Sequence, residues 1–157
     1  MRNRLLLALL VAMVVSPVAG ARADSTVAVG ATRCALDGGA ATVAAGSAVT
    51  VRGGWAAATR GLVEDFLHAQ QTTISVNGGP AVDISGSYQA ASGNWRTDVF
   101  YPTGITLATG ESLIFTLRVT TSHRLHDGLV FEDGTSGKPR FAEAGILFAV
   151  TCTVTGA

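Results

Sequence analysis

The stretch TSHRLHDG, residues 121–128, holds the densest group of side chains that could do chemistry, with two of the three histidines and an aspartate. His123, His126 and Asp127 are residue types that bind zinc, and a bound zinc ion activates water for hydrolysis. A spacing of three would align the histidines on a helix, but after a strand it points their side chains to opposite faces. We therefore interpret the stretch as a solvated turn and expect neither a metal nor a cofactor.

A metal site stays open as the least favoured alternative, because a loop can bring separated side chains together. His123, His126 and Asp127 would then form the centre of a small metal-dependent hydrolase, with His68 as a further ligand from elsewhere in the chain. Zinc sites normally use three or four well-placed ligands, and no cysteine or second His-x-His pattern supports one here.

No other catalytic motif is present. The chain lacks the Gly-x-Ser-x-Gly turn that exposes a nucleophilic serine. The carboxylate pairs at 64–65 and 132–133 are adjacent in sequence, whereas glycosidase carboxylates face each other across the sugar. We predict a non-enzymatic binding or structural module that recognises an extracellular protein or glycan.

The amphipathic aromatic residues favour one more specific alternative, a carbohydrate-binding module. Trp95 and Tyr101 have the same parity on one expected strand, and together with Tyr88 they could form a flat platform for stacking a sugar. Trp55 follows Gly53-Gly54 at a strand end and is interpreted as a core residue instead, since buried tryptophan is usual in a sandwich.

Most of the chain alternates apolar and polar residues, which is typical of half-buried strands. The clearest case is ESLIFTLRVTTS, where Leu113, Phe115, Leu117 and Val119 share one face. We predict an all-β, Ig-like antiparallel β-sandwich. Its expected strands lie at residues 26–29, 32–36, 47–55, 95–101, 111–122 and 148–156, with a hairpin over 72–88.

One segment, TRGLVEDFLHAQ, departs from this alternation. Leu62, Val63, Phe66 and Leu67 recur at helical spacing, and Thr59 is a suitable N-cap. The pattern predicts one short helix at about residues 60–69. A helix of this length is marginal alone, so its apolar face should pack over one open end of the sandwich.

The two cysteines, Cys34 and Cys152, lie near opposite ends of the chain. In an exported protein an isolated pair is most simply a disulfide, so we predict this bond. Cross-linking so long a loop stabilises the fold by about 4–5 kcal/mol in the chain-entropy treatment.

The N-terminus predicts export. Arg2 and Arg4 precede an apolar run over residues 5–15, and the small residues at 21 and 23 suit a signal peptidase, so we place a signal peptide at 1–23 and a single domain at 24–157. The run is too short to span a bilayer, and no second run of that length follows. We expect a secreted protein without membrane insertion.

Charge bears on the class of partner. The eleven basic and eleven acidic residues balance over the whole chain, but without Arg2, Arg4 and Arg22 the remainder carries a net charge of −3. Nucleic acid and anionic membranes require basic patches, so neither is expected as a partner.

The phrase TGITLATGESLIFTLRV, residues 103–119, resembles one that is common in bacterial Ig-like sandwich domains. There an apolar residue, a Gly-Glu-Ser turn and an alternating strand follow one another, although the family usually has proline where Thr109 stands. With GW at 54–55, TRGLVEDFL at 59–67 and the final TCTVTG, the layout is also similar to uncharacterised small exported bacterial proteins. The resemblance implies a fold and export, and it implies no activity.

Overall fold

The computed structural model describes residues 25–90, 95–128 and 141–157. The predicted signal peptide lies outside the described residues.

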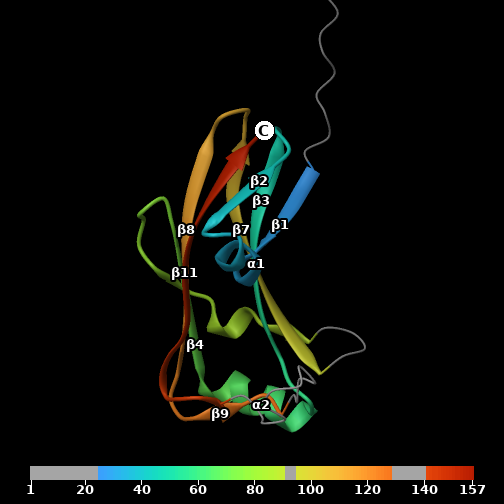
Figure 1. Ribbon diagram of the computed structural model, residues 1–157, viewed down its shortest axis with the longest axis vertical. Coiled ribbons are helices and arrows are strands. Elements are labelled where there is room, and N and C mark those ends of the chain that lie inside the picture. Colours follow the sequence, from blue (N-terminus) through green and yellow to red (C-terminus); the bar gives the residue numbers. More distant parts are fainter. Residues whose placement is uncertain (1–24, 91–94, 129–140) are drawn as a thin grey trace, which may run out of the picture.

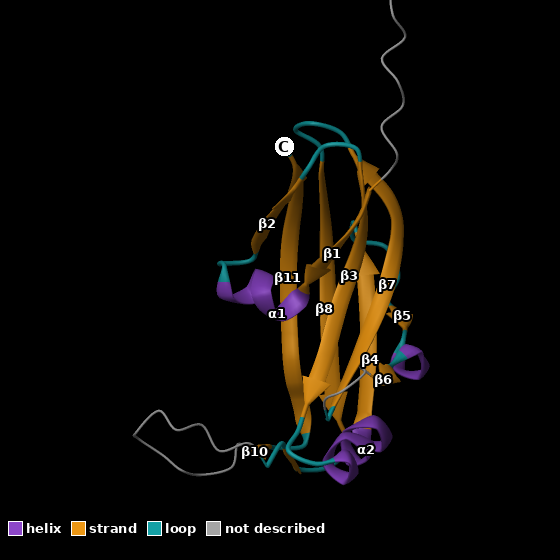
Figure 2. Cartoon of the chain, turned by 90° about the vertical axis from the view of Figure 1, so that its right-hand side faces the viewer, coloured by secondary structure: helices purple, strands orange, loops and turns teal. Residues whose placement is uncertain are grey.

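The described strands form two layered sheets (Figure 2). The first sheet contains, in order, β1 (Ser25–Gly30), β3 (Ser47–Ala56), β7 (Arg96–Leu107) and β6 (Gln89–Ala90). The second contains β2 (Ala40–Val43), β11 (Gly145–Gly156), β8 (Ser112–Thr121), β4 (Gln70–Val76) and β5 (Val82–Asp83). A small pair is formed by β9 (Leu125–His126) and β10 (Phe141–Ala142).

This order confirms the predicted all-β sandwich. The first sheet follows the A-B-E-D order of Ig domains, and β11, β8 and β4 correspond to their strands G, F and C. The hairpin predicted over 72–88 is confirmed in part, as the antiparallel pair of β4 and the two-residue β5. Its expected second arm ends early, since Ser85–Ser87 form a 3-10 helix, and Val82 is 42% exposed rather than buried.

The sheets are mixed rather than purely antiparallel. β1 runs parallel to β3, and β2 runs parallel to β11. Both are edge strands. Between β1 and its partner β3 the chain passes through β2 in the other sheet, and β2 itself pairs with β11 near the other end of the chain. Alternation identifies a strand but carries no information on the direction of its partner, which is why the sequence did not indicate this.

The apolar faces predicted from alternation form the core between the sheets. In β8 the alternating residues Leu113, Phe115, Leu117 and Val119 are all buried, each worth roughly 1.5–3 kcal/mol relative to exposure. A second, smaller cluster unites Phe66, Ala69, Val119 and Leu125 at one end of the sandwich.

The predicted helix is confirmed as α2 (Arg60–Ala69). Thr59 caps it, because its side-chain oxygen accepts a hydrogen bond from the Leu62 amide at 3.4 Å. Val63, Phe66 and Ala69 form the buried face. Figure 1 shows α2 at the end of the molecule opposite the C-terminus, where it covers the smaller cluster.

The prediction of a strand at residues 32–36 is wrong, and the structure has a second helix there, α1 (Ala31–Leu36). Ala31 and Cys34 are both buried, which is the spacing of one helical turn, whereas Leu36 is 76% exposed. Two apolar residues in alternation do not distinguish a strand from such a turn. Helix α1 carries the chain from the edge of the first sheet to the edge of the second (Figure 2).

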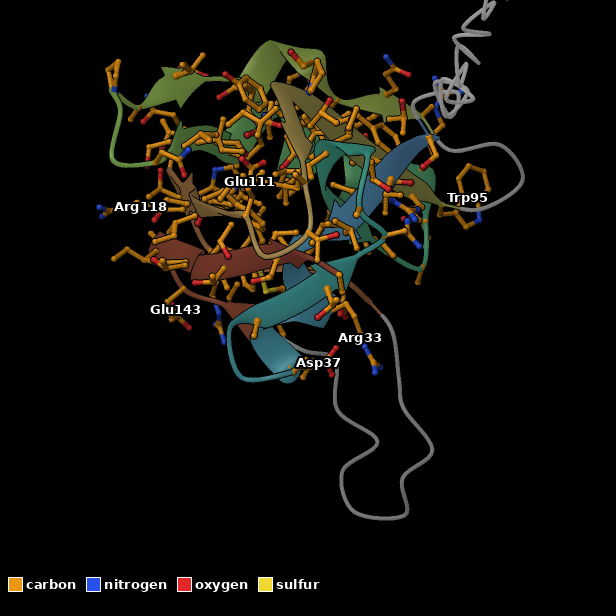
Figure 3. The ribbon with its side chains drawn as sticks, turned by 90° about the horizontal axis from the view of Figure 1, so that it is seen from above. Arg33, Asp37, Trp95, Glu111, Arg118 and Glu143 are labelled. Atoms are coloured by element: carbon orange, nitrogen blue, oxygen red, sulfur yellow. A yellow bond between two sulfur atoms is a disulfide. The ribbon has the colours of Figure 1, made fainter. Side chains whose placement is uncertain are left out.

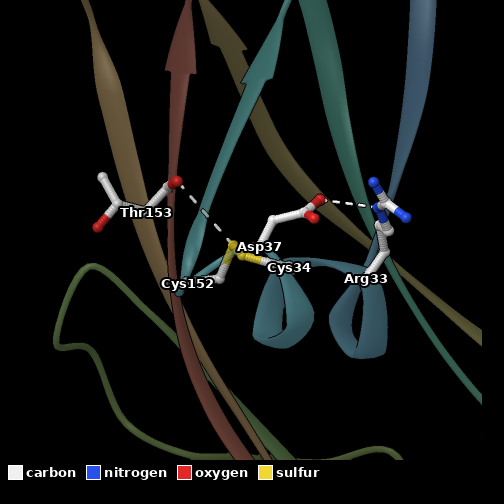
Figure 4. Close-up of a disulfide and its surroundings, with 5 residues drawn as sticks. All are labelled: Arg33, Cys34, Asp37, Cys152 and Thr153. Atoms are coloured by element: carbon white, nitrogen blue, oxygen red, sulfur yellow. Dashed lines mark hydrogen bonds and ion pairs between the residues drawn. A yellow bond between two sulfur atoms is a disulfide. The ribbon is translucent and has the colours of Figure 1, made fainter.

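The predicted disulfide between Cys34 and Cys152 is confirmed. Their Cα atoms are 6.1 Å apart, within the usual range, and the bond closes a separation of 118 positions. The bond joins α1 to β11 (Figure 4), whereas the disulfide typical of antibody domains joins strands B and F. Its effect here is to hold α1 against the side of the sandwich.

Candidate functional site

The histidine-rich stretch forms contacts that tie the end of β8 to α2. His123 lies just after β8, and its Nε2 is 2.9 Å from Asp65 Oδ1 on the helix. Its other ring nitrogen is 3.3 Å from Ser122 Oγ. The imidazole thus has a partner on each side.

The other two residues of the proposed metal site have different surroundings. The His126 ring in β9 lies 5.6 Å from the Phe141 ring, which also carries the Arg124 guanidinium at 4.1 Å. Asp127 is buried, and its backbone oxygen accepts a hydrogen bond from Ala58 at 2.6 Å. Within residues 25–90, 95–128 and 141–157, no three or more His, Cys, Asp or Glu side chains group closely enough to hold a metal ion.

The three aromatic residues of the expected sugar platform do not share one exposed face. Trp95 precedes β7, is 54% exposed and projects from the edge of the molecule (Figure 3). Tyr101 is half-buried against the main core. Tyr88 is half-buried, with its hydroxyl 3.0 Å from Thr72 Oγ1 and its ring in an edge-to-face arrangement with Phe66.

Tyr88 instead belongs to an aromatic group between the sheets. The Trp55 and Phe66 rings are stacked, with centroids 5.0 Å apart and planes 7° apart, and Phe66 meets Tyr88 at 5.4 Å in an edge-to-face arrangement. Burial raises the pKa of the Tyr88 hydroxyl, partly offset by its hydrogen bond with Thr72. Tyr88 is therefore neutral throughout the physiological pH range.

These rings line a hollow of about 300 Å³, which we name the inter-sheet cavity. It lies where the two core clusters meet, under the start of α1. Besides Trp55, Phe66 and Tyr88, its lining consists of Ala31, Thr32, Gly53, Gly54, Leu117, Val119, Leu147 and Phe148.

One local feature of the strands shapes this space. On β11, the register shifts between Ile146 and Phe148, so an extra residue enters the strand as a bulge. As a result, the consecutive residues Leu147 and Phe148 both line the cavity. On β3, by contrast, Gly53 is closely packed, because a Cβ there would lie 3.2 Å from side-chain atoms of Leu117 and Val99.

Trp55 carries an unsatisfied polar group on its ring. The indole Nε1 is buried and has no hydrogen-bond partner, a state shared among the described residues only with Arg52 Nε. A buried donor without a partner costs about 1–3 kcal/mol, so natural proteins rarely leave one.

The outer face of the first sheet carries a buried carboxylate. Asp98 lies between two arginines, with Arg52 Nη2 and Arg96 Nη2 each 2.9 Å from one of its oxygens. Burial alone would raise the pKa of Asp98, but the hydrogen bonds and charges of Arg52 and Arg96 outweigh it and hold the pKa below its ordinary value. Arg52 also lies 5.6 Å above the Phe100 ring.

Neither the inter-sheet cavity nor the Asp98 cluster was predicted from the sequence. One signal was present, because adjacent glycines inside a strand often mark a close approach of another group. Gly54 pairs with Asp98 across the ladder, and a Cβ at this position would collide with the Asp98 carboxylate. On the opposite face, a Cβ at Gly53 would lie 3.2 Å from side-chain atoms of Leu117 and Val99.

Among the described residues, no helix combines the length and the apolar character needed to cross a membrane. Comparisons with protein-family models, with curated proteins and with solved structures find no match. The geometry of the site is therefore the basis for proposing a function.

Proposed function

We propose that this protein is an exported, non-enzymatic binding module whose ligand site is the inter-sheet cavity. The observation that carries the proposal is a mainly apolar hollow of about 300 Å³ that opens to solvent between the two core clusters. Its volume is at the lower end of the range for small-molecule sites. Half-buried Trp55, Tyr88 and Phe148 present aromatic surface to it.

The proposal of a secreted protein is supported by the predicted signal peptide and by the disulfide, since disulfides persist in oxidising compartments outside the cytoplasm. The disulfide also fixes α1, whose residues Ala31 and Thr32 form part of the cavity wall.

A fluorescence titration tests the proposal. The uncharged apolar dye N-phenyl-1-naphthylamine, added to the mature protein, should bind saturably at one site and raise Tm, because a ligand of the native state stabilises it. Leu147→Trp should fill the cavity and abolish saturable binding. The matched control is Ile146→Trp, since Ile146 is the preceding residue and is 61% exposed. Absence of saturable binding, or equal binding by the folded Leu147→Trp variant, would refute the proposal.

A carbohydrate-binding module is the second candidate, and one observation supports it. Trp95 and Phe100 are 54% and 43% exposed near the start of β7, with Arg96 between them. Exposed aromatic rings beside polar side chains suit sugar stacking. A glycan panel probed with the wild type and with Trp95→Ala separates the candidates, because only sugar binding should depend on Trp95.

A further inference from the structure

The outer face of the second sheet carries a second candidate binding site, which is independent of the inter-sheet cavity. We propose that this face binds a sugar acid, a ring with hydroxyl groups and one carboxylate, through Arg118 and the polar side chains beside it. Three features of the face lead to this class of ligand: a hollow lined by hydrogen-bonding groups, an arginine without an acidic partner, and a carboxylate on the far side of the hollow.

The hollow has a volume of about 250 Å³, and we name it the outer hollow. Its described lining consists of Gln71, Thr73, Arg118 and Thr120. Strand register brings these side chains together, because Thr73 lies opposite Arg118 and Gln71 lies opposite Thr120 where β4 pairs with β8. The two cross-strand pairs therefore share one face of the sheet. The alternate residues of β8 point the other way and are buried, and two of them line the inter-sheet cavity.

Arg118 differs from the other arginines in its lack of an acidic partner. Within the described part of the chain its guanidinium makes no ion pair or hydrogen bond, whereas each of the other described arginines contacts a carboxylate: Arg33, Arg52, Arg60, Arg96 and Arg124. The Arg118 side chain is exposed and projects outward from the sheets (Figure 3). A guanidinium presents five N–H donors in a planar fork that matches a carboxylate. Arg118 is therefore available to bind an anion.

The rest of the lining favours a ligand with hydroxyl groups. Thr73 and Thr120 contribute hydroxyls and Gln71 contributes an amide, so each side chain can both donate and accept hydrogen bonds. Among the described residues, the lining includes no large apolar side chain. A closed cavity of about 150 Å³ accommodates benzene, so the outer hollow has room for one substituted six-membered ring.

Asp83 gives the outer hollow a direction. It lies opposite Thr73 on the side away from Arg118, so the carboxylate and the guanidinium are two strands apart, roughly 10 Å. Hydrogen bonds from the Ser85 hydroxyl and amide hold the pKa of Asp83 below its ordinary value, so Asp83 is charged at neutral pH. A ligand carboxylate is thus attracted to the Arg118 side of the hollow, and ligand hydroxyls can donate to Asp83.

The test compares two sugars that differ only in the acid group. Methyl β-glucuronide carries a carboxylate where methyl β-glucoside carries a hydroxymethyl group. Each is titrated into the isotope-labelled mature protein, and the amide shifts of residues 71–73 and 118–120 in NMR spectra give the dissociation constants. We expect saturable shifts in both segments and about three- to tenfold tighter binding of the glucuronide, the worth of a solvent-exposed contact between charged groups. In about 1 M salt this preference should disappear.

Arg118→Gln removes the charge and should leave the fold intact, because Arg118 has no polar contact to lose within the described residues. It should abolish the preference for the glucuronide. The matched control is Arg60→Gln, since Arg60 is an exposed arginine on α2 that pairs with Glu64. Trp95→Ala is a second control, because Trp95 precedes β7 of the first sheet. Both controls should keep the preference.

Each contrary result has a distinct meaning. If residues 71–73 and 118–120 do not shift, or if Arg118→Gln keeps the preference, the outer hollow is not the site and the inference is wrong. If Trp95→Ala abolishes the preference, the sugar binds beside Trp95 and the inference is also wrong. If the 6-O-sulfate ester of the glucoside binds but the glucuronide does not, the carboxylate class is wrong. The dye titration of the inter-sheet cavity is unaffected by these outcomes, so it tests the proposed function separately.

Discussion

At the residue scale, the strongest electrostatic feature is Asp98. Its side chain is 7% exposed and receives hydrogen bonds from Arg52 and Arg96. Because the hydrogen bonds of the ionised form depress the pKa in the folded state, this stabilisation is fully present above the unfolded pKa of about 3.9 and is lost as the pH falls through the lower folded pKa.

We predict that Asp98→Asn lowers the free energy of unfolding by about 1–3 kcal/mol at pH 7, because it removes the charge that both arginines contact. The variant should lose less stability than the wild type between pH 5 and pH 2, as measured by urea denaturation. Asp37→Asn is the control, since the exposed Arg33–Asp37 pair should contribute less than about 1 kcal/mol. An unchanged acid dependence in Asp98→Asn would contradict this account.

Gly54 is required by the same cluster. A Cβ at this position would meet both the Asp98 carboxylate and the Thr97 carbonyl oxygen, which lies in the backbone and cannot move aside. We predict that Gly54→Ala destabilises the protein by about 1–3 kcal/mol in urea denaturation.

The same substitution at Gly61 is the matched control for Gly54→Ala. Gly61 lies in the first turn of α2 with no atom within 4 Å of an added Cβ, so Gly61→Ala should stabilise by up to about 1 kcal/mol. If both alanine variants behaved alike, the steric account of Gly54 would be wrong.

At the element scale, α1 depends on its covalent attachment. The helix has only six residues and its N-cap Gly30 makes no side-chain hydrogen bond, so it is not expected to be stable alone. Its buried face is Ala31 and Cys34, and the disulfide anchors that face to β11. The pairing of β1 with β3 and of β2 with β11 holds the two ends of this segment, and the disulfide adds a link through the buried face of the helix.

Replacing both Cys34 and Cys152 by serine should therefore have two effects. The free energy of unfolding should fall by up to about 5 kcal/mol, and dye binding to the cavity should weaken because α1 is released. Thermal melting and the dye titration measure these effects. A reducing agent should lower the Tm of the wild type and leave that of the double variant unchanged. A double variant that melts with the wild type would show that the bond contributes nothing.

Helix α2 illustrates how much local sequence can specify. Its cap at Thr59 and its apolar stripe both lie within the segment, so its limits could be predicted closely. By contrast, α1 is determined by a partner 118 positions away, and its short apolar pattern fits a strand equally well. Local patterns predict elements that are stabilised by their own residues.

At the scale of the whole molecule, the sandwich positions the cavity between its two core clusters. The larger cluster is formed by both sheets, and the smaller by the underside of α2 with β8 and β9. The bulge at Leu147 on β11 brings Leu147 and Phe148 to the wall of the cavity, together with Trp55 and Gly53 of β3. The cavity thus results from features of two sheets that come close only in the folded chain.

The surroundings of the candidate metal residues likewise depend on parts of the chain that come close only on folding. His123 and His126 are three positions apart in sequence, yet the first contacts α2 and the second lies beside Phe141 in β9 and β10. A spacing of three places two side chains on the same face only in a helix, and neither histidine lies in a helix. The partners Asp65 and Phe141 come from other parts of the chain.

The sequence alone determined the alternating strands, helix α2 and the pairing of the two cysteines, because each depends on a periodicity, a cap or a residue type that is visible locally. Only the tertiary structure decided the helical form of α1, the parallel edge strands and the inter-sheet cavity. The physical reason is that these features depend on which distant residues face one another. Packing between separate strands decides that, and no single segment encodes it.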